Sequence, residues 1–213
     1  MIFNNLKVQQ KKIKNGLNKS LQKVLNDCQF ILGPEVNELE KKLAKYIGVK
    51  FCLGFSSCTD SLMASLMSLN IEIGDEVITP SFSYISAAEC IVRLGAKPIF
   101  VDVDLETCCI IEKNIEKNIT NKTKAILPIS LFGNMPNYNL INKIAKKNKI
   151  SVIEDGAQSF GSSYKGKKSC SLTSIGCTSF FPNKSLGCYG DGGAVFTNNK
   201  NLFKSLQEIR IHG

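Results

Sequence analysis

The chain has 213 residues, of which 43% are hydrophobic and 21% charged, and its formal net charge is +9. This composition is typical of a globular protein with a sizeable core, and no apolar run approaches the roughly 18 residues of a membrane span. The positive charge comes almost entirely from lysine, because Arg93 and Arg210 are the only arginines. Since nucleic-acid readers rely on arginine, we expect neither a nucleic-acid partner nor a membrane partner.

The N-terminus and the cysteines indicate a cytoplasmic protein. Residues 1–14 are polar and contain lysine, so they lack the apolar segment of a secretory signal. The nine cysteines include no Cys-x-x-Cys pair, and His212 is the only histidine. Metal-ligand spacing is therefore absent, and we expect free thiols and no bound metal.

The first expected elements are two helices. Residues 5–27 predict the first one, because apolar residues recur near the helical period of 3.6. Gly33 then permits an unusual turn, and Pro34 suits the first turn of a second helix that runs to about Ile47.

Strands and helices alternate through the rest of the chain, which predicts an α/β fold. The strand-like runs are 50–54, 76–79, 98–103, 125–130, 150–154, 176–181 and 194–197, and the helix-like runs are 60–69, 85–94, 137–147 and 200–211. Several strands are apolar on both faces, which favours one mostly parallel sheet covered by helices on both sides. Residues 187–193 form a tight turn, so the last strands could be antiparallel, and only one domain is visible.

Two strand ends precede segments that could bind a phosphate and a planar ring. In Phe55-Ser-Ser-Cys-Thr-Asp60, Ser57 or Thr59 can cap the following helix, whose N–H groups then form an anion site. A plain helix cap is the alternative. In Thr79-Pro-Ser-Phe-Ser-Tyr84, the Tyr84 ring could stack on a cofactor, or it could be a core or lid aromatic.

A third strand ends in a carboxylate at Val152-Ile-Glu-Asp155-Gly-Ala-Gln158. A carboxylate at the end of a buried strand is costly unless it is paired. A protonated pyridine nitrogen would supply the partner, and this pairing makes pyridoxal phosphate (PLP) an electron sink. The alternative is that Asp155 caps a following helix.

Lys184 is the only lysine between residues 169 and 199, where Asp191 is the only other charged residue. A partly desolvated lysine has a lowered pKa, which frees its lone pair for attack on a carbonyl. Glycines at 187, 190, 192 and 193 allow a loop close to a ligand. The hypothesis is a lysine that forms a Schiff base, and an ordinary surface lysine is the alternative.

One further motif resembles a nucleotide-binding phosphate loop but does not complete it. Residues 161–168 approximate G-x-x-x-x-G-K-[S/T], yet Lys168 stands where a serine or threonine would bind magnesium. No helix-forming run follows directly, so this segment is interpreted as an exposed hairpin.

In this order, the motifs resemble the DegT/StrS-like family of sugar-nucleotide aminotransferases, which use PLP on the aspartate-aminotransferase fold. The matching segments are Phe30–Val36, Ser57–Asp60, Gly74–Tyr84, Gly95–Asp104, Val152–Gln158, Ser179–Lys184 and Gly190–Val195. The resemblance implies a three-layer α/β/α sandwich with a mostly parallel mixed sheet, the large domain of fold type I. Residues 1–213 would comprise N-terminal helices plus this PLP-binding domain, with the C-terminal small domain absent.

The resemblance also implies a role for each site residue. Lys184 would form the Schiff base, Asp155 would hold the pyridine nitrogen, Gln158 would lie near the ring hydroxyl, Tyr84 would stack on the ring, and Cys58, Thr59 and Ser179 would hold the phosphate. The implied reaction moves an amino group, with glutamate as donor, to a keto-sugar nucleotide. A homodimer is implied for a full-length member.

Three points qualify the resemblance. Cys58 stands where the family usually has glycine, and its side chain could crowd the phosphate loop. Family members continue well beyond Gly213, so the alternative is a truncated, inactive fragment or a cofactor-binding module. Related sugar dehydratases replace the Schiff-base lysine with histidine, and Lys184 argues against that activity.

Overall fold

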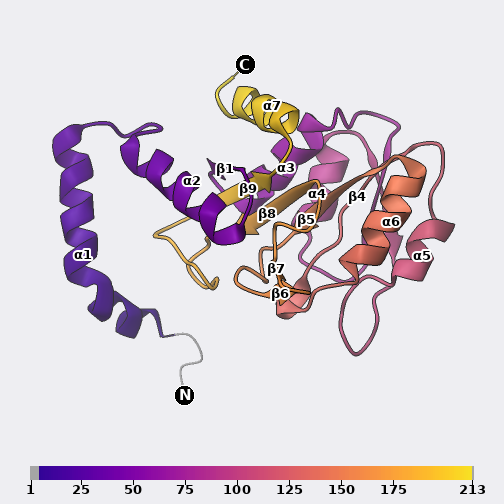
Figure 1. Cartoon of the computed structure of the whole chain (residues 1–213), viewed down its shortest axis with the longest axis horizontal. Coiled ribbons are helices and arrows are strands. Elements are labelled where there is room, and N and C mark those ends of the chain that lie inside the picture. The colour runs from indigo at the N-terminus through magenta and orange to yellow at the C-terminus, as the bar shows by residue number, and fades with distance from the viewer. Residues whose placement is uncertain (1–4, 213) are drawn as a thin grey trace.

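A computed structural model of the chain describes residues 5–212. Its centre is a seven-stranded sheet in the order β1-β9-β8-β5-β4-β2-β3 (Figure 1). The strands are β1 (Phe51–Phe55), β2 (Glu76–Pro80), β3 (Lys97–Val101), β4 (Thr123–Ile126), β5 (Ser151–Asp155), β8 (Ile175–Ser179) and β9 (Gly193–Thr197). Strands β8, β5, β4, β2 and β3 are parallel, whereas β9 is antiparallel to both of its neighbours, β8 and β1. The predicted mixed, mostly parallel sheet is confirmed.

Helices cover both faces of this sheet, which confirms the three-layer sandwich. The helices within residues 5–212 are α1 (Leu6–Asp27), α2 (Pro34–Ile47), α3 (Cys58–Ser68), α4 (Ser86–Arg93), α5 (Glu112–Lys117), α6 (Tyr138–Asn148) and α7 (Lys200–Arg210), with a 3₁₀ turn at Leu131–Gly133, and α1 takes no part in covering the sheet. Within β5, Ile153 packs in the core under α3, α4 and α7, whereas Val152 packs in the core under α5 and α6. Strands that are apolar on both faces require this double cover.

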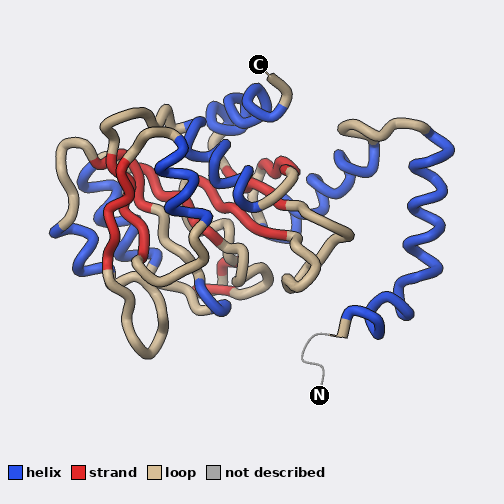
Figure 2. Tube along the Cα trace, turned by 180° about the vertical axis from the view of Figure 1, so that it is seen from behind, coloured by secondary structure: helices blue, strands red, loops and turns tan. Residues whose placement is uncertain are grey.

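Helix α1 stands apart from the rest of the chain in Figures 1 and 2. It forms where the periodicity predicts a helix, but none of its side chains is buried. Its polar connections include an ion pair between Lys23 and Glu35 on α2, with 2.7 Å between Nζ and Oε1. Gln10 also accepts a hydrogen bond from the Tyr189 hydroxyl. No helix within residues 5–212 has the length and apolar character to cross a bilayer.

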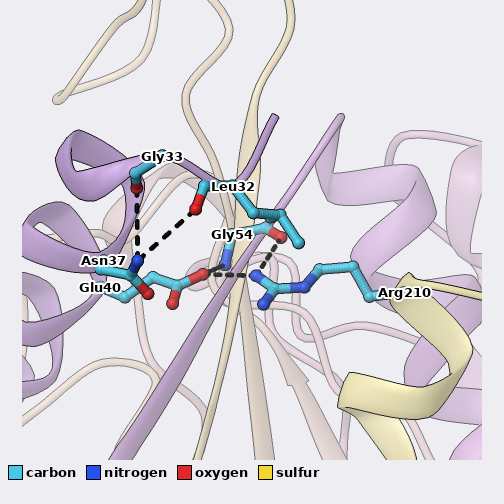
Figure 3. Close-up of polar contacts among 6 residues, drawn as sticks. All are labelled: Leu32, Gly33, Asn37, Glu40, Gly54 and Arg210. Carbon is cyan, nitrogen blue, oxygen red and sulfur yellow. Dashed lines mark hydrogen bonds and ion pairs between the residues drawn. The ribbon is translucent and has the colours of Figure 1, made fainter. Parts of the chain in front are cut away.

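A partly buried ion pair joins α7 to α2 and β1 (Figure 3). The Arg210 Nη1 lies 2.5 Å from Glu40 Oε1, and the two side chains are only 15% and 12% exposed. Glu40 Oε1 also accepts a hydrogen bond from the Gly54 N–H at 2.8 Å. In the same view, the Asn37 side chain donates to the Gly33 carbonyl at 3.3 Å, which secures the first turn of α2.

Several boundaries differ from those predicted. Helix α3 begins at Cys58 rather than at Asp60, because Ser57 is the N-cap. The strand expected over 125–130 ends at Ile126, shortly before Pro128, which has no N–H for the ladder. Helix α5 was not expected. Strands β6 (Ser163–Tyr164) and β7 (Lys167–Lys168) form the predicted hairpin, and the nine cysteines are free thiols.

Candidate active site

Side chains with hydroxyl, carboxyl, amide, thiol and amine groups line one cavity of about 360 Å³. Strands β1, β2, β5 and β8 run the same way, so their carboxyl ends and the start of β9 meet at this edge of the sheet. All seven predicted site residues line the cavity: Cys58, Thr59, Tyr84, Asp155, Gln158, Ser179 and Lys184. Four loops that are far apart in the sequence thus converge, as expected for a doubly wound sheet.

Asp155 is the buried carboxylate of the site, with a side chain only 6% exposed. Burial raises its pKa, while the Ala157 N–H and the Lys184 charge partly oppose that rise. The Ala157 N–H donates to Oδ1 at 2.9 Å, and the Cys58 thiol lies 3.8 Å from the same oxygen. Within residues 5–212 no hydrogen bond to Oδ2 is recorded, so that oxygen can accept one from a ligand.

Lys184 lies in the loop between β8 and β9 and is half-buried, as its charge-free surroundings predict. The loop folds back on itself, because the Lys184 N–H donates to the Phe181 carbonyl at 2.8 Å. Glycine is required at 187, where a Cβ would lie 2.5 Å from the Pro182 carbonyl oxygen. The backbone therefore fixes where the Lys184 amine enters the cavity.

The N-terminus of α3 forms another wall of the cavity. Ser57 caps the helix, accepting a hydrogen bond from the Asp60 N–H at 3.0 Å. Thr59 and Cys58 occupy the first turn, where backbone N–H groups have no partner within the helix. Gly193 packs directly against this turn, since a Cβ there would lie 2.4 Å from the Ser57 carbonyl oxygen. The helix end thus has backbone N–H groups at Cys58 and Thr59 that are not used within the helix.

The Cys58 side chain is buried and turned toward Asp155. Burial raises the pKa of this thiol well above its ordinary value, and the Asp155 charge adds to the rise. The neutral thiol therefore faces the carboxylate, and it does not add a negative charge to the anion site.

Gln158 is oriented by a backbone contact that the sequence did not reveal. Its Oε1 accepts a hydrogen bond from the Phe132 N–H at 2.9 Å. Because the oxygen is held in this way, the amide NH₂ remains as the donor that Gln158 can offer in the cavity. Phe132 itself has φ of 56° in the 3₁₀ turn, a backbone conformation that no sequence signal at a phenylalanine predicts.

Tyr84 and Ser179 occupy opposite extremes of exposure. The Tyr84 ring is 71% exposed and lies at the cavity rim, whereas Ser179 is 7% exposed. The Ser179 Oγ accepts from the Phe181 N–H at 3.2 Å. Sequence reasoning missed Ser83, whose buried Oγ has no partner within residues 5–212 and whose side chain also lines the cavity. The sequence signal that could have identified Ser83 as a cavity residue is its position next to Tyr84.

Comparison with known proteins agrees with this geometry. The model of the DegT/DnrJ/EryC1/StrS aminotransferase family matches residues 11–213. The chain belongs to this family. It is 51% identical over 211 residues to the UDP-2-acetamido-2-deoxy-3-oxo-D-glucuronate aminotransferase of Pseudomonas aeruginosa. The aligned region covers 99% of this chain and 59% of that protein.

Solved structures of DegT/DnrJ/EryC1/StrS aminotransferases share the fold. A member from Brucella abortus superposes with a TM-score of 0.97 at 40% identity, covering 100% of this chain and 59% of that one. The NtdA structure from Bacillus subtilis, with bound cofactor PMP, gives a TM-score of 0.87 at 35% identity, over 93% and 44% of the two chains. The chain thus spans between 44% and 59% of the length of these relatives.

The residues of this family member fit PLP on chemical grounds. An aldehyde needs an amine, which Lys184 supplies, and a protonated ring nitrogen needs a carboxylate, which Asp155 supplies with Oδ2 free to accept. A phosphate needs unpaired N–H groups, which the start of α3 offers. These three groups line a single cavity, so each can reach a different part of one small molecule.

Proposed function

We propose that this protein is a PLP-dependent aminotransferase that transfers an amino group to a keto-sugar nucleotide. The observation that carries the proposal is the convergence of Lys184, Asp155 and the α3 N-terminus on one cavity. The family match supports the reaction class, and the named activity of the Pseudomonas aeruginosa relative supports the substrate class.

The cofactor would be held at both ends. Asp155 binds the protonated pyridine nitrogen, which stabilises the ionised form of this buried carboxyl. The N–H groups of Cys58 and Thr59, together with the Ser179 hydroxyl, bind the phosphate. Gln158 donates its amide to the ring oxygen, and Tyr84 covers the exposed ring face. When bound, PLP withdraws electrons from the carbon whose proton must leave.

Lys184 has two functions in this proposal. Its Nζ would hold the cofactor in the resting protein, and the same amine, when free, would accept and return the substrate proton. The half-buried position suits both functions, because the amine contacts the cavity without being sealed in the core. Amino donor and acceptor occupy the cavity in turn, so we expect ping-pong kinetics.

The finer assignments follow from the relatives. We propose glutamate as amino donor, in line with the 36% identical 3-oxo-glucose-6-phosphate:glutamate aminotransferase of Bacillus subtilis. A UDP-linked 3-keto sugar is the acceptor to test first, because the 51% identical relative is named for such a substrate. A homodimer in the cytoplasm completes the proposal.

An absorbance titration with PLP tests the proposal. We expect wild type to develop a visible Schiff-base band that persists after free PLP is removed by desalting, and Lys184→Ala to lack it. Lys143→Ala, which removes an exposed lysine on α6, is the matched control and keeps the band. A band that survives in Lys184→Ala refutes the role of that lysine. Binding without amino transfer to any keto-sugar nucleotide supports the cofactor-binding module instead.

A further inference from the structure

The second carboxyl group of β5 lies on the face opposite the cavity. Glu154 precedes Asp155, and successive side chains of a strand point to opposite faces. The Glu154 side chain is 0% exposed, and the Ser169 hydroxyl donates to its Oε1 at 2.6 Å. Its Oε2 has no hydrogen-bond partner within residues 5–212. An acid buried in this way destabilises the fold unless it is neutral.

No cation faces Glu154 in the described part of the chain. The titratable groups around it are the Tyr138 hydroxyl from α6, the Cys170 thiol, the Cys177 thiol on β8 and Asp155 on the same strand. Burial raises the pKa of Glu154 to about 7, and the Ser169 hydrogen bond, the nearby Cys170 N–H and the Ser130 hydroxyl only partly oppose this. The carboxyl is therefore largely protonated in mildly acidic solution and about half ionised at neutral pH.

The Ser169 hydroxyl connects Glu154 to the turn that carries the site residues. When Ser169 donates its proton to Glu154 Oε1, the Ser159 hydroxyl is the donor in the 2.6 Å contact between the two serines. Ser159 in turn closes the segment Gly156–Ser159, because its N–H donates to the Gly156 carbonyl at 3.1 Å. A hydrogen-bonded chain thus runs from Glu154 to the residue beside Gln158.

Close packing reinforces this connection. A Cβ at Gly156 would lie 2.9 Å from the Ser169 Oγ and 2.6 Å from the Cys170 Sγ. The Gly156 N–H donates to the Cys177 carbonyl at 2.8 Å, so the turn is pressed between β8 and the Ser169–Cys170 segment. Displacement of Ser169 would leave the Cys170 Sγ as the remaining contact of Gly156 with that segment.

We propose that Glu154 is a positioning residue, which acts through Ser169 and Ser159 to hold the Gly156–Ser159 turn so that Asp155 and Gln158 meet the cofactor ring. The part of this inference that concerns the cofactor rests on the proposed function. Its structural content, an ordered turn dependent on Glu154, can be measured without cofactor. Glu154 itself contacts neither cavity nor cofactor, because it lies on the opposite face of the sheet.

Three variants separate positioning from general stability. Glu154→Leu removes the acceptor, Ser169→Ala removes the link, and Glu154→Gln keeps an acceptor in neutral form. Ser68→Ala is the control, because its hydroxyl is also buried and donates within α3 to the Ser65 carbonyl at 2.8 Å. If Glu154→Leu does not fold, Ser169→Ala measures the same link.

The first readout is amide hydrogen exchange in the protein without PLP. We expect Ser169→Ala and Glu154→Leu to accelerate exchange at Ala157 and Ser159 by at least about tenfold more than at β4 amides. Ser68→Ala should accelerate all amides equally, and Glu154→Gln should leave the turn protected. Uniform acceleration in Ser169→Ala, as in Ser68→Ala, overturns the inference.

The second readout is the dissociation constant for PLP. We expect Ser169→Ala and Glu154→Leu to weaken binding by about tenfold or more, as loss of outer-shell partners commonly does, and Glu154→Gln to stay near wild type. Unchanged affinity in Ser169→Ala overturns the inference while leaving the proposed function intact. Failure of wild type to bind PLP refutes the proposed function. The exchange data alone then test whether the Gly156–Ser159 turn depends on Glu154.

Discussion

Glu154→Gln is expected to stabilise the protein at alkaline pH and to remove part of its pH dependence. Burial raises the pKa of Glu154 from an ordinary value of 4.5 to about 7. Between these values the folded protein holds a proton that the unfolded chain has lost, so the free energy of unfolding falls as pH rises. Above about pH 7 the loss is complete and constant.

The size of this effect follows from the pKa difference. At 1.36 kcal/mol per pKa unit, a rise from 4.5 to about 7 corresponds to about 3 kcal/mol, as an upper bound. Glutamine keeps the acceptor for Ser169 and cannot ionise, so the variant should gain up to this amount at pH 8 and little at pH 4.5. The gain should appear gradually across the interval.

Urea unfolding of both proteins at half-unit steps from pH 4.5 to pH 8.5 measures the difference directly. Subtracting the two curves cancels the contributions of groups common to both proteins. A difference that stays flat, or that grows toward acid pH, would refute the assignment of a neutral buried carboxyl at Glu154. Equal m-values for the two proteins would show that both unfold from equally compact states.

Two further substitutions test the supports of the site. Gly193→Ala places a Cβ 2.4 Å from the Ser57 carbonyl oxygen, so we expect a loss of about 1–3 kcal/mol in unfolding free energy and weaker phosphate binding. Gly16→Ala, in open space on α1, is its control and should not destabilise. Arg210→Ala leaves Glu40 partly buried without its cationic partner, and should cost up to about 3 kcal/mol by urea unfolding. Equal melting temperatures for either variant and wild type would contradict its prediction.

The site residues at the strand ends could be predicted from the sequence because charged side chains there follow or interrupt apolar segments. Asp155 follows an apolar strand, and Lys184 lies in a nearly charge-free segment, so both residues stand out against their neighbours. The topology then brings them to one edge, since parallel strands end on the same side. The structure confirms this convergence, while the roles of the two side chains stay predictions.

Other parts of the site depend on contacts that no local pattern encodes. Phe132 orients Gln158 through its backbone N–H, which any residue could supply. The Glu154–Ser169 contact joins residues separated by a hairpin, so their sequence spacing carries no signal. Helix α5 has Ile115 as its only buried residue, and six residues are too few to show a helical period.

The pairing of β1 with β9 affects the order in which the domain folds and its resistance to unfolding. Phe51 pairs with Thr197, so one of the earliest strands in the chain joins the sheet beside the last one. Gly193 at the start of β9 also supports the α3 N-terminus, so the anion site is incomplete until β9 has docked. Closing so long a loop is slow, and synthesis must pass residue 197 before it can begin. The proposed cofactor would therefore be captured late in folding, and once bound it would oppose global unfolding of the sheet.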